Sequence, residues 1–177
     1  MQINIGCGPF RAPSPWVNLD VVRIEGHIEP DVVVPSIWPE TWGLTGATKV
    51  YMGHVLEHIQ WELVPDFLQQ VLDICEVGAE IAIVGPDIRK SVAKWKHDQL
   101  SWDDVMGALE NHTSFQPAGE WDGARHQWNC YEQRVFDVAV HAGIGAIEAV
   151  PVNRSKLGAW PVTSYVDTQC CVVGIKL

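Results

Sequence analysis

Short apolar runs typical of β-strands alternate along this chain with stretches whose apolar residues recur at helical spacing. This order indicates an α/β fold built on a mainly parallel sheet. In such a sheet the carboxyl ends of the strands meet at one edge, which is where ligands bind. We expect strands at residues 2–5, 16–22, 31–34, 49–52, 81–84, 146–150 and 168–175, and the longer helices at 64–75, 87–97 and 131–142.

Local signals mark the ends of the predicted helices. Pro65 fits only the first turn of a helix, and Gly78 is expected to end that helix. Asp87 is placed to cap the next helix through its carboxylate. Ser101 with Asp104 resembles a capping box in front of a further short helix.

The charge of the chain restricts its partners. The 177 residues carry 12 basic and 22 acidic side chains, a formal charge of −10. Nucleic acid is not an expected partner, since proteins held by phosphate contacts usually present a basic face. The chain shows no apolar run of 18 residues and no leader pattern, so we expect a cytoplasmic protein without a membrane segment. We expect one domain over residues 1–177, with 88–129 forming a helical and loop lid.

The five cysteines, Cys7, Cys75, Cys130, Cys170 and Cys171, are odd in number and fit no zinc-binding spacing. We expect reduced and mostly buried thiols. Because successive side chains of a strand point to opposite faces, Cys170 and Cys171 are not expected to bond to each other.

The first candidate site is the turn Gly6-Cys7-Gly8, which follows the first predicted strand. Glycine allows positive φ and a close approach of the backbone to a ligand, although a tight structural turn would use the same residues. Arg11 stands where a dinucleotide fingerprint has its third glycine. Pro13 and Pro15 also oppose a long helix after the turn, so NAD is not expected.

The second candidate is Asp20 at the end of the second strand. A carboxylate at this place can accept both hydroxyls of a ribose, or it can be a solvated strand end. Asn18, two residues earlier, is expected to brace the loop rather than to bind a ligand.

The third candidate is the run His54-Val55-Leu56-Glu57-His58, which joins a strand end to a helix start. His54 can act as a general base, with Glu57 either as its orienting partner or as an acid in the first turn of the following helix. His54 and His58 could instead pack or form structural hydrogen bonds. The order H-x-x-E-H also occurs in one group of zinc proteases. Those enzymes place the motif inside a long helix, so we expect no metal here.

Four motifs in this order resemble the class I S-adenosylmethionine-dependent methyltransferases, most nearly the small bacterial and phage proteins described as predicted methyltransferases. The motifs are residues 3–8, 15–20, 54–58 and 77–87, which end on Gly-Cys-Gly, Asn-Leu-Asp, Leu-Glu-His and Gly-Pro-Asp. The resemblance implies a Rossmann-like, seven-stranded, mainly parallel sheet with its last strand antiparallel and helices on both faces.

The resemblance also implies a set of residues for the cofactor S-adenosylmethionine. Asp20 would hold its ribose, Val21 would touch the adenine, and His54 would lie beside the sulfonium. The family's usual Asp after the third strand is missing, so Ser36 or the backbone must take its place. The complete set of implied cofactor residues is Gly6, Cys7, Gly8, Asp20, Val21, Ser36, Gly53 and His54.

The expected function is methyl transfer to a small molecule or saccharide, with His54 and Glu57 as catalytic residues. Arg125, His126 and Tyr131 are candidate contacts of the acceptor. The motif D-P-P-Y of amino-methylating DNA enzymes is absent. Two alternatives remain, a non-catalytic module that keeps the fold as a scaffold and another nucleotide-using enzyme.

Overall fold

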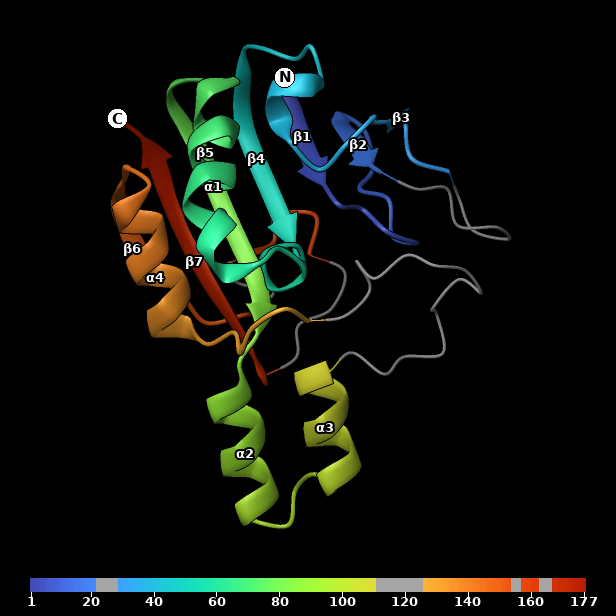
Figure 1. Cartoon of the computed structure of the whole chain (residues 1–177), viewed down its shortest axis with the longest axis vertical. Helices are drawn as coiled ribbons and strands as arrows, with labels where there is room; N and C mark the ends of the chain where they lie inside the picture. Colours follow the sequence, from blue (N-terminus) through green and yellow to red (C-terminus); the bar gives the residue numbers. More distant parts are fainter. Residues whose placement is uncertain (22–28, 111–125, 154–156, 163–166) are drawn as a thin grey trace.

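The computed structural model describes residues 1–21, 29–110, 126–153, 157–162 and 167–177. Its centre is a seven-stranded sheet in the order β3-β2-β1-β4-β5-β7-β6 (Figure 1). Strands β1 to β5 run parallel to one another, and β7 runs antiparallel to both β5 and β6. The predicted seven-stranded Rossmann-like sheet with an antiparallel last strand is therefore confirmed. The strands are β1 Gln2–Ile5, β2 Trp16–Asp20, β3 Val32–Val33, β4 Ala47–Gly53, β5 Cys75–Pro86, β6 Ile144–Ala149 and β7 Gln169–Lys176.

The first long helix, α1 (Val64–Asp73), is shorter than predicted, and the strand after it is longer. Pro65 does lie in the first turn of α1. The prediction that Gly78 ends the helix is wrong, because β5 already begins at Cys75. Gly78 instead has φ +82° inside β5, where the pairing of β5 with β4 shifts register. Cys75 misled the prediction because a buried apolar residue fits either pattern.

Both helix caps were predicted correctly. The Asp87 carboxylate accepts hydrogen bonds from the backbone N–H of Arg89 (3.1 Å) and Lys90 (3.4 Å) at the start of α2, Ile88–Lys96. The Ser101 hydroxyl accepts from the Asp104 N–H (3.1 Å), and the Asp104 carboxylate accepts from the Ser101 N–H (2.9 Å). This capping box opens α3, Trp102–Glu110.

Helices α2 and α3 lie side by side beyond the carboxyl end of β5 (Figure 1). The indole rings of Trp95 and Trp102 join them, with centroids 4.9 Å apart. Both helices belong to the lid predicted over residues 88–129. Residues 111–125 of that lid fall outside the described residues, so the lid itself stays a prediction.

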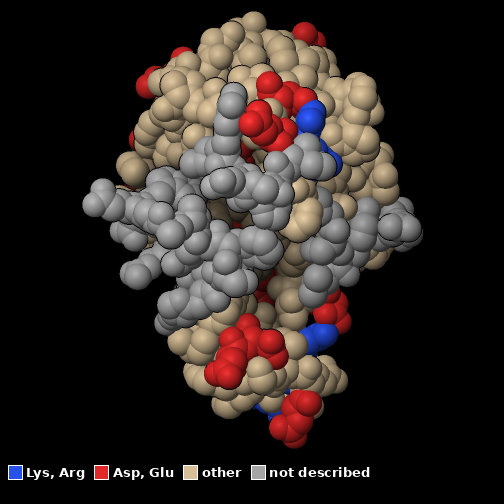
Figure 2. Space-filling model, turned by 90° about the vertical axis from the view of Figure 1, so that its right-hand side faces the viewer, with Lys and Arg blue, Asp and Glu red and all other residues tan. Residues whose placement is uncertain are grey.

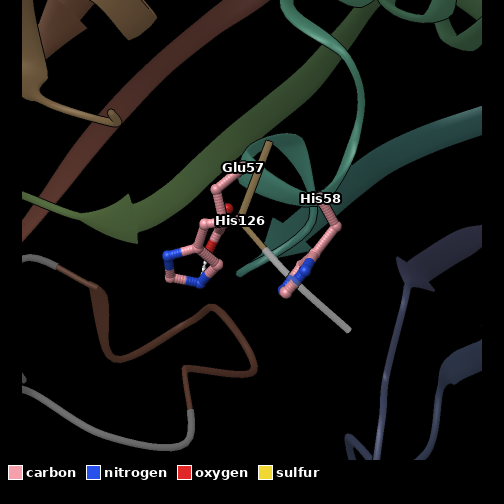
Figure 3. A group of neighbouring side chains, drawn as sticks. All are labelled: Glu57, His58 and His126. Atoms are coloured by element: carbon pink, nitrogen blue, oxygen red, sulfur yellow. Dashed lines mark ion pairs between the residues drawn. The ribbon is translucent and has the colours of Figure 1, made fainter. Parts of the chain in front are cut away.

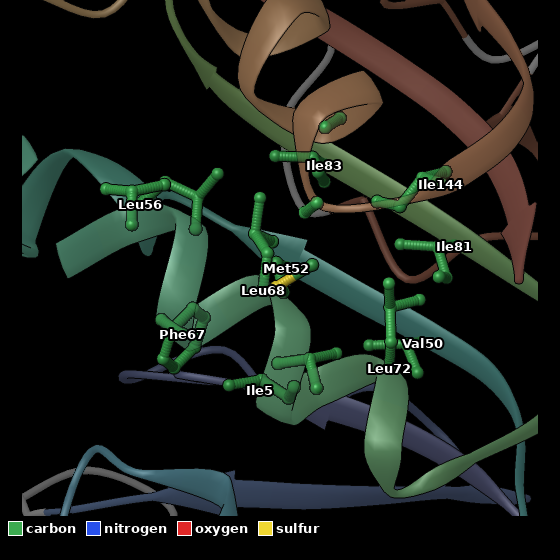
Figure 4. Close-up of a cluster of buried hydrophobic side chains, with 14 of the residues drawn as sticks. Ile5, Val50, Met52, Leu56, Phe67, Leu68, Leu72, Ile81, Ile83 and Ile144 are labelled. Carbon is green, nitrogen blue, oxygen red and sulfur yellow. The ribbon is translucent and has the colours of Figure 1, made fainter. Parts of the chain in front are cut away.

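The main core lies between one face of the sheet and the helices α1 and α4, Glu132–His141. Each helix turns an apolar face inward, and strand residues of alternating position meet it. Phe67 and Leu68 of α1 pack in one cluster with Met52 of β4 and Ile83 of β5 (Figure 4). This packing fixes the strands whose carboxyl ends carry the candidate site.

The opposite face of the sheet is covered differently. Its cluster joins Trp16, Tyr51 and Cys171 of the strands with Leu157 and the partly buried Trp160. Residues 6–15, between β1 and β2, form no helix, as the prolines in this stretch predicted. Cys171 lies in this cluster and Cys170 in the main core, so the two thiols do lie on opposite faces. All five cysteines are free and buried.

The carboxyl ends of β1, β2, β4 and β5 meet at one edge of the sheet (Figure 1). From β1 the chain proceeds outward to β2 and β3, and then returns to β4 on the other side of β1. The carboxyl edge at such a reversal of strand order is the usual ligand site of open α/β sheets. Gly6, Asp20, Gly53 and His54 all stand at or next to these strand ends.

Candidate functional site

The glycine turn, Gly6-Cys7-Gly8, has the backbone that the sequence predicted. Gly6 and Gly8 have φ of +63° and +53°, where a side chain is strained. A Cβ atom on Gly6 would lie 2.7 Å from Cγ2 of Val55, whereas one on Gly8 would meet nothing within 4 Å. The turn is therefore closed on the side of Gly6 and open on the side of Gly8.

Two hydrogen bonds tie the glycine turn to the end of β2. The Gly8 N–H donates to Oδ2 of Asp20 at 2.7 Å, and the Cys7 N–H donates to the Leu19 carbonyl at 3.1 Å. Asp20 thus faces the turn across the sheet edge. Burial, helped by the charge of Asp20, raises the pKa of the Cys7 thiol to about 12. Cys7 is therefore a protonated spacer and not a nucleophile.

A buried amide network supports the turn from below. The Oδ1 of Asn18 accepts from Asn4 Nδ2 (2.9 Å) and from the Ala12 N–H (2.7 Å). The Nδ2 of Asn18 donates to the Ala12 carbonyl (3.0 Å) and to Oδ2 of Asp31 (2.7 Å). Asn18 braces the loop, as predicted. Asn4 and Asp31 were missed, although a polar Asn4 within an apolar strand run was a usable signal.

His54 leaves the end of β4 in the left-handed region, with φ +58°. Its Nδ1 lies 2.9 Å from Oε1 of Glu57, and its Nε2 lies 2.7 Å from Nε2 of Gln169. Burial lowers the pKa of His54, but the hydrogen bond and charge of Glu57 outweigh it and raise the pKa above 6.5. The predicted pairing of His54 with Glu57 is present, whereas Gln169 of β7 was missed.

Glu57 is a buried carboxylate, with its side chain only 1% exposed. It belongs to the short 3-10 helix η2, Leu56–His58. Burial raises the pKa of Glu57, but the hydrogen bond and charge of His54, with the charges of His58 and His126, hold it below 4.5. Its Oε2 accepts no hydrogen bond from any residue that the structure describes.

His126, which follows residues 111–125 in the sequence, reaches the same carboxylate. Its Nε2 lies 4.0 Å from Oε1 of Glu57, and its ring meets that of His58 edge-on, with centroids 5.0 Å apart. Figure 3 shows Glu57 and His58 extending from η2 toward His126. We call His54, Glu57, His58 and His126 the histidine cluster. Burial is the main cause that lowers the pKa of His126.

The backbone holds His126 in the cluster. The Gln127 N–H donates to the Glu57 carbonyl at 2.6 Å, and the Trp128 indole N–H donates to the Leu56 carbonyl at 2.8 Å. The sequence offered His126 only as an acceptor contact. Its contact with Glu57 joins residues far apart in the chain, and no local pattern marks it.

The other predicted residues have different surroundings. The Ser36 hydroxyl lies 2.8 Å from that of Thr41 and accepts from the Trp38 N–H at 3.1 Å. Val21 is half-buried against the main core. The Tyr131 ring lies under the Arg89 guanidinium, 3.7 Å away.

Two further predicted residues complete the set. A Cβ atom on Gly53 would lie 2.5 Å from the Tyr51 hydroxyl, so this strand end accepts only glycine without a shift. Arg125 lies outside the described residues. The structure therefore brings together Gly6, Gly8 and Asp20 in one group, and His54, Glu57 and His126 in another.

The solved structures that this chain matches include S-adenosylmethionine-dependent methyltransferases. One from Archaeoglobus fulgidus matches 98% of this chain and 85% of its own, with TM-score 0.57 and 10% identity. One from Methanosarcina mazei matches 99% of this chain and 91% of its own, with TM-score 0.53 and 10% identity. The chain therefore has the class I S-adenosylmethionine-dependent methyltransferase fold.

Some of the matched structures are much longer. PigF, solved with SAH, matches 80% of this chain at TM-score 0.50 and 11% identity, and the chain spans 34% of its length. The chain spans the same share, 34%, of a further matched methyltransferase. No protein-family model matches the sequence, and a search of curated proteins finds no match. No helix in the described part of the chain has the length and apolar character needed to cross a membrane.

Proposed function

We propose that the chain binds S-adenosylmethionine at the carboxyl edge of its sheet and transfers the methyl group to a small-molecule acceptor. The observation that carries the proposal is the glycine turn hydrogen-bonded to Asp20, one strand away from Gly53 and His54. In this fold, a turn with open space at Gly8 lets a ligand approach the backbone closely.

The proposed cofactor contacts follow the order of the strands. The methionine part lies against Gly6 and Gly8, and the ribose hydroxyls bond to the Asp20 carboxylate. The adenine lies toward Val21, with the backbone near Ser36 bonding its amino group, because the Ser36 hydroxyl is already bonded to Thr41. The sulfonium then faces the end of β4.

In the proposed reaction an acceptor nucleophile attacks the methyl group in line and releases S-adenosylhomocysteine. Holding the two reactants in this geometry supplies much of the acceleration. His54 takes the acceptor's proton, and Glu57 orients the imidazole and stabilises the imidazolium. The contact of Gln169 with Nε2 of His54 must open for this step, since that nitrogen receives the proton.

The surface supports a small acceptor rather than a nucleic acid. Acidic side chains gather at both ends of the face shown in Figure 2, and basic ones are few. With a formal charge of −10, the protein repels a phosphate backbone at long range. A small molecule or saccharide is the acceptor class that we propose.

Isothermal titration with S-adenosylmethionine tests the proposal. We expect one site per chain and at least a tenfold weaker affinity in Asp20→Ala, which removes the ribose acceptor. Asp73→Ala is the matched control, because Asp73 is exposed on α1, away from this edge. No binding at millimolar cofactor, or equal affinity in both variants, contradicts the proposal.

A second candidate is a module that binds the cofactor without turnover. The contact between Gln169 and His54 favours it, because this contact occupies the nitrogen that a general base needs. Release of S-adenosylhomocysteine in the presence of a panel of hydroxyl, amine and thiol acceptors separates the two. Turnover that falls in His54→Asn supports the enzyme, and cofactor binding without product across the panel supports the module.

A further inference from the structure

Three side chains of the histidine cluster form a compact group of potential metal ligands. Glu57, His58 and His126 each offer one ligand atom, and these atoms lie within 4.8 Å of one another. They come from two segments, η2 and the residues before α4, which are joined by hydrogen bonds from the Gln127 N–H and the Trp128 indole N–H to backbone carbonyls of η2. The group is therefore held in place by the fold at the carboxyl edge of the sheet (Figure 3).

The orientation of the His126 ring leaves a lone pair inside the group. Its Nδ1 donates to the Ala108 carbonyl at 2.9 Å, so in the neutral ring Nε2 is the unprotonated nitrogen. This Nε2 faces Oε1 of Glu57 at 4.0 Å, too far for a hydrogen bond. Two electron-rich atoms thus face each other across a gap that a cation would satisfy.

The carboxylate of Glu57 also has unused bonding capacity. A buried carboxylate is costly unless paired charges and hydrogen bonds surround it. Glu57 is 1% exposed, yet among the described residues its Oε2 accepts no hydrogen bond and its Oε1 is bonded to His54. A positive ion beside this carboxylate would provide the missing compensation.

We propose that Glu57, His58 and His126 bind a divalent first-row transition-metal ion such as Zn²⁺ or Mn²⁺. Two imidazoles and one carboxylate suit these ions, whereas Mg²⁺ prefers oxygen ligands alone. Ligand atoms ~2.0–2.1 Å from a tetrahedral ion lie ~3.3 Å apart, so small side-chain rotations close the present spacing. This inference departs from the sequence-based expectation of no metal, which weighed only His54 and His58.

The neighbours of the proposed ligands resemble the outer shell of a metal site. Metal-binding histidines usually donate their other N–H to a carbonyl or carboxylate, as His126 does to Ala108. Ligating carboxylates are likewise hydrogen-bonded, as Glu57 is to His54. His54, the proposed general base, would in addition orient this carboxylate toward the ion.

The position of the ion beside β4 suggests a role in binding the methyl acceptor, and this role rests on the proposed function. Three protein ligands leave at least one coordination position open. The cluster follows directly on β4, so that position would face an acceptor brought to the cofactor. An acceptor oxygen on the ion would be both oriented and more acidic. We therefore infer an acceptor that presents a hydroxyl group.

Zn²⁺ titration of the chelator-treated chain, without S-adenosylmethionine, tests the site. We expect one ion per chain by calorimetry, and visible Co²⁺ absorption that disappears on adding Zn²⁺. His58→Ala and His126→Ala should each weaken Zn²⁺ affinity at least tenfold. His141→Ala, a change on the exposed end of α4, is the matched control and should keep the affinity of the unmodified chain.

The result stays decisive even where a variant folds poorly. His58 is half-buried, so its alanine variant tests the ligand with little loss of core, and circular dichroism checks the fold of each protein. No Zn²⁺ or Mn²⁺ binding at ~100 μM, or equal affinity in His58→Ala and His141→Ala, overturns the site. Cofactor binding is titrated separately with chelator present, so failure of the metal site and failure of the proposed function are distinguished.

Discussion

The glycine turn and the histidine cluster occupy neighbouring places on one sheet edge, but they use their polar groups in opposite ways. Below the turn, both polar atoms of the Asn18 side chain have two partners each. In the cluster, Glu57 is buried and its Oε2 accepts no hydrogen bond from any described residue. The Nε2 of His126 faces the other oxygen, Oε1, without a hydrogen bond.

This difference distinguishes a structural support from a candidate binding site. A saturated network has no bonding capacity for a ligand, so the Asn18 network can only shape the turn. A cluster with unused acceptors and several titratable groups can bind a proton or an ion. The unused hydrogen-bonding capacity of a polar residue near a ligand site is thus a better guide to its role than its distance from the site.

The largest effect is expected from a substitution that breaks the hydrogen-bonded network of Asn18. Asn18→Ala leaves Asn4, the Ala12 backbone and Asp31 without their shared partner. Since each orphaned buried group costs ~1–3 kcal/mol, we expect the free energy of unfolding to fall by about 3 kcal/mol. Urea denaturation measures it. Asn129→Ala, at an exposed position, should change it by less than ~0.5 kcal/mol.

A second pair of variants compares the closed and open sides of the glycine turn. Gly6→Ala adds strain at φ +63° and a contact with Val55, so we expect a loss of about 2 kcal/mol. Gly8→Ala adds strain alone, at φ +53° in open space, and should cost about 1 kcal/mol. Thermal unfolding ranks them, and equal losses would contradict the one-sided turn.

A smaller effect is expected in the histidine cluster when the charge of Glu57 is removed. The His54 side chain is 43% exposed, and the hydrogen bond and charge of Glu57 are what raise its pKa, so in Glu57→Gln the pKa of His54 should fall. NMR titration of the imidazole protons measures this change. Glu40→Gln, at an exposed position, is the control and should leave the His54 titration unchanged.

The same variant has a defined effect on stability across pH. The lowered pKa of Glu57 stabilises the fold above pH 4.5, and this contribution is lost as pH falls through the folded value. The raised pKa of His54 stabilises it below pH 6.5, and this is lost as pH rises through the folded value. The free energy of unfolding of the unmodified chain should therefore exceed that of Glu57→Gln most between pH 4.5 and 6.5. A difference in this free energy that does not change with pH would contradict the pairing of His54 with Glu57.

Local chemistry made much of the fold predictable from sequence. Both helix caps, at Asp87 and at Ser101 with Asp104, use contacts that span at most three residues. The local sequence is therefore enough to predict them. The prolines of residues 6–15 likewise excluded a helix by their own geometry. The end of α1 was placed wrongly because Cys75 can be buried in the core either from a helix or from a strand.

The candidate site was predictable in part, for the same physical reason. Pairing of His54 with Glu57 spans three residues, and the sequence indicated it. The contacts of Asp31 with Asn18, Gln169 with His54 and His126 with Glu57 exist only once the chain has folded. No spacing rule carries such contacts, so the histidine cluster emerged only from the structure.

The helix-free connection between β1 and β2 also bears on the order in which the edge folds. Pairing Gln2 with Trp16 closes a much shorter loop than pairing Gln2 with Lys49 of β4. Loop closure grows as (3/2)RT ln n, so the shorter loop is favoured by about 1 kcal/mol. We expect the glycine turn to gain protection from hydrogen exchange early in refolding. The histidine cluster also requires His126 to dock on Glu57, so the glycine turn can form before the cluster is complete.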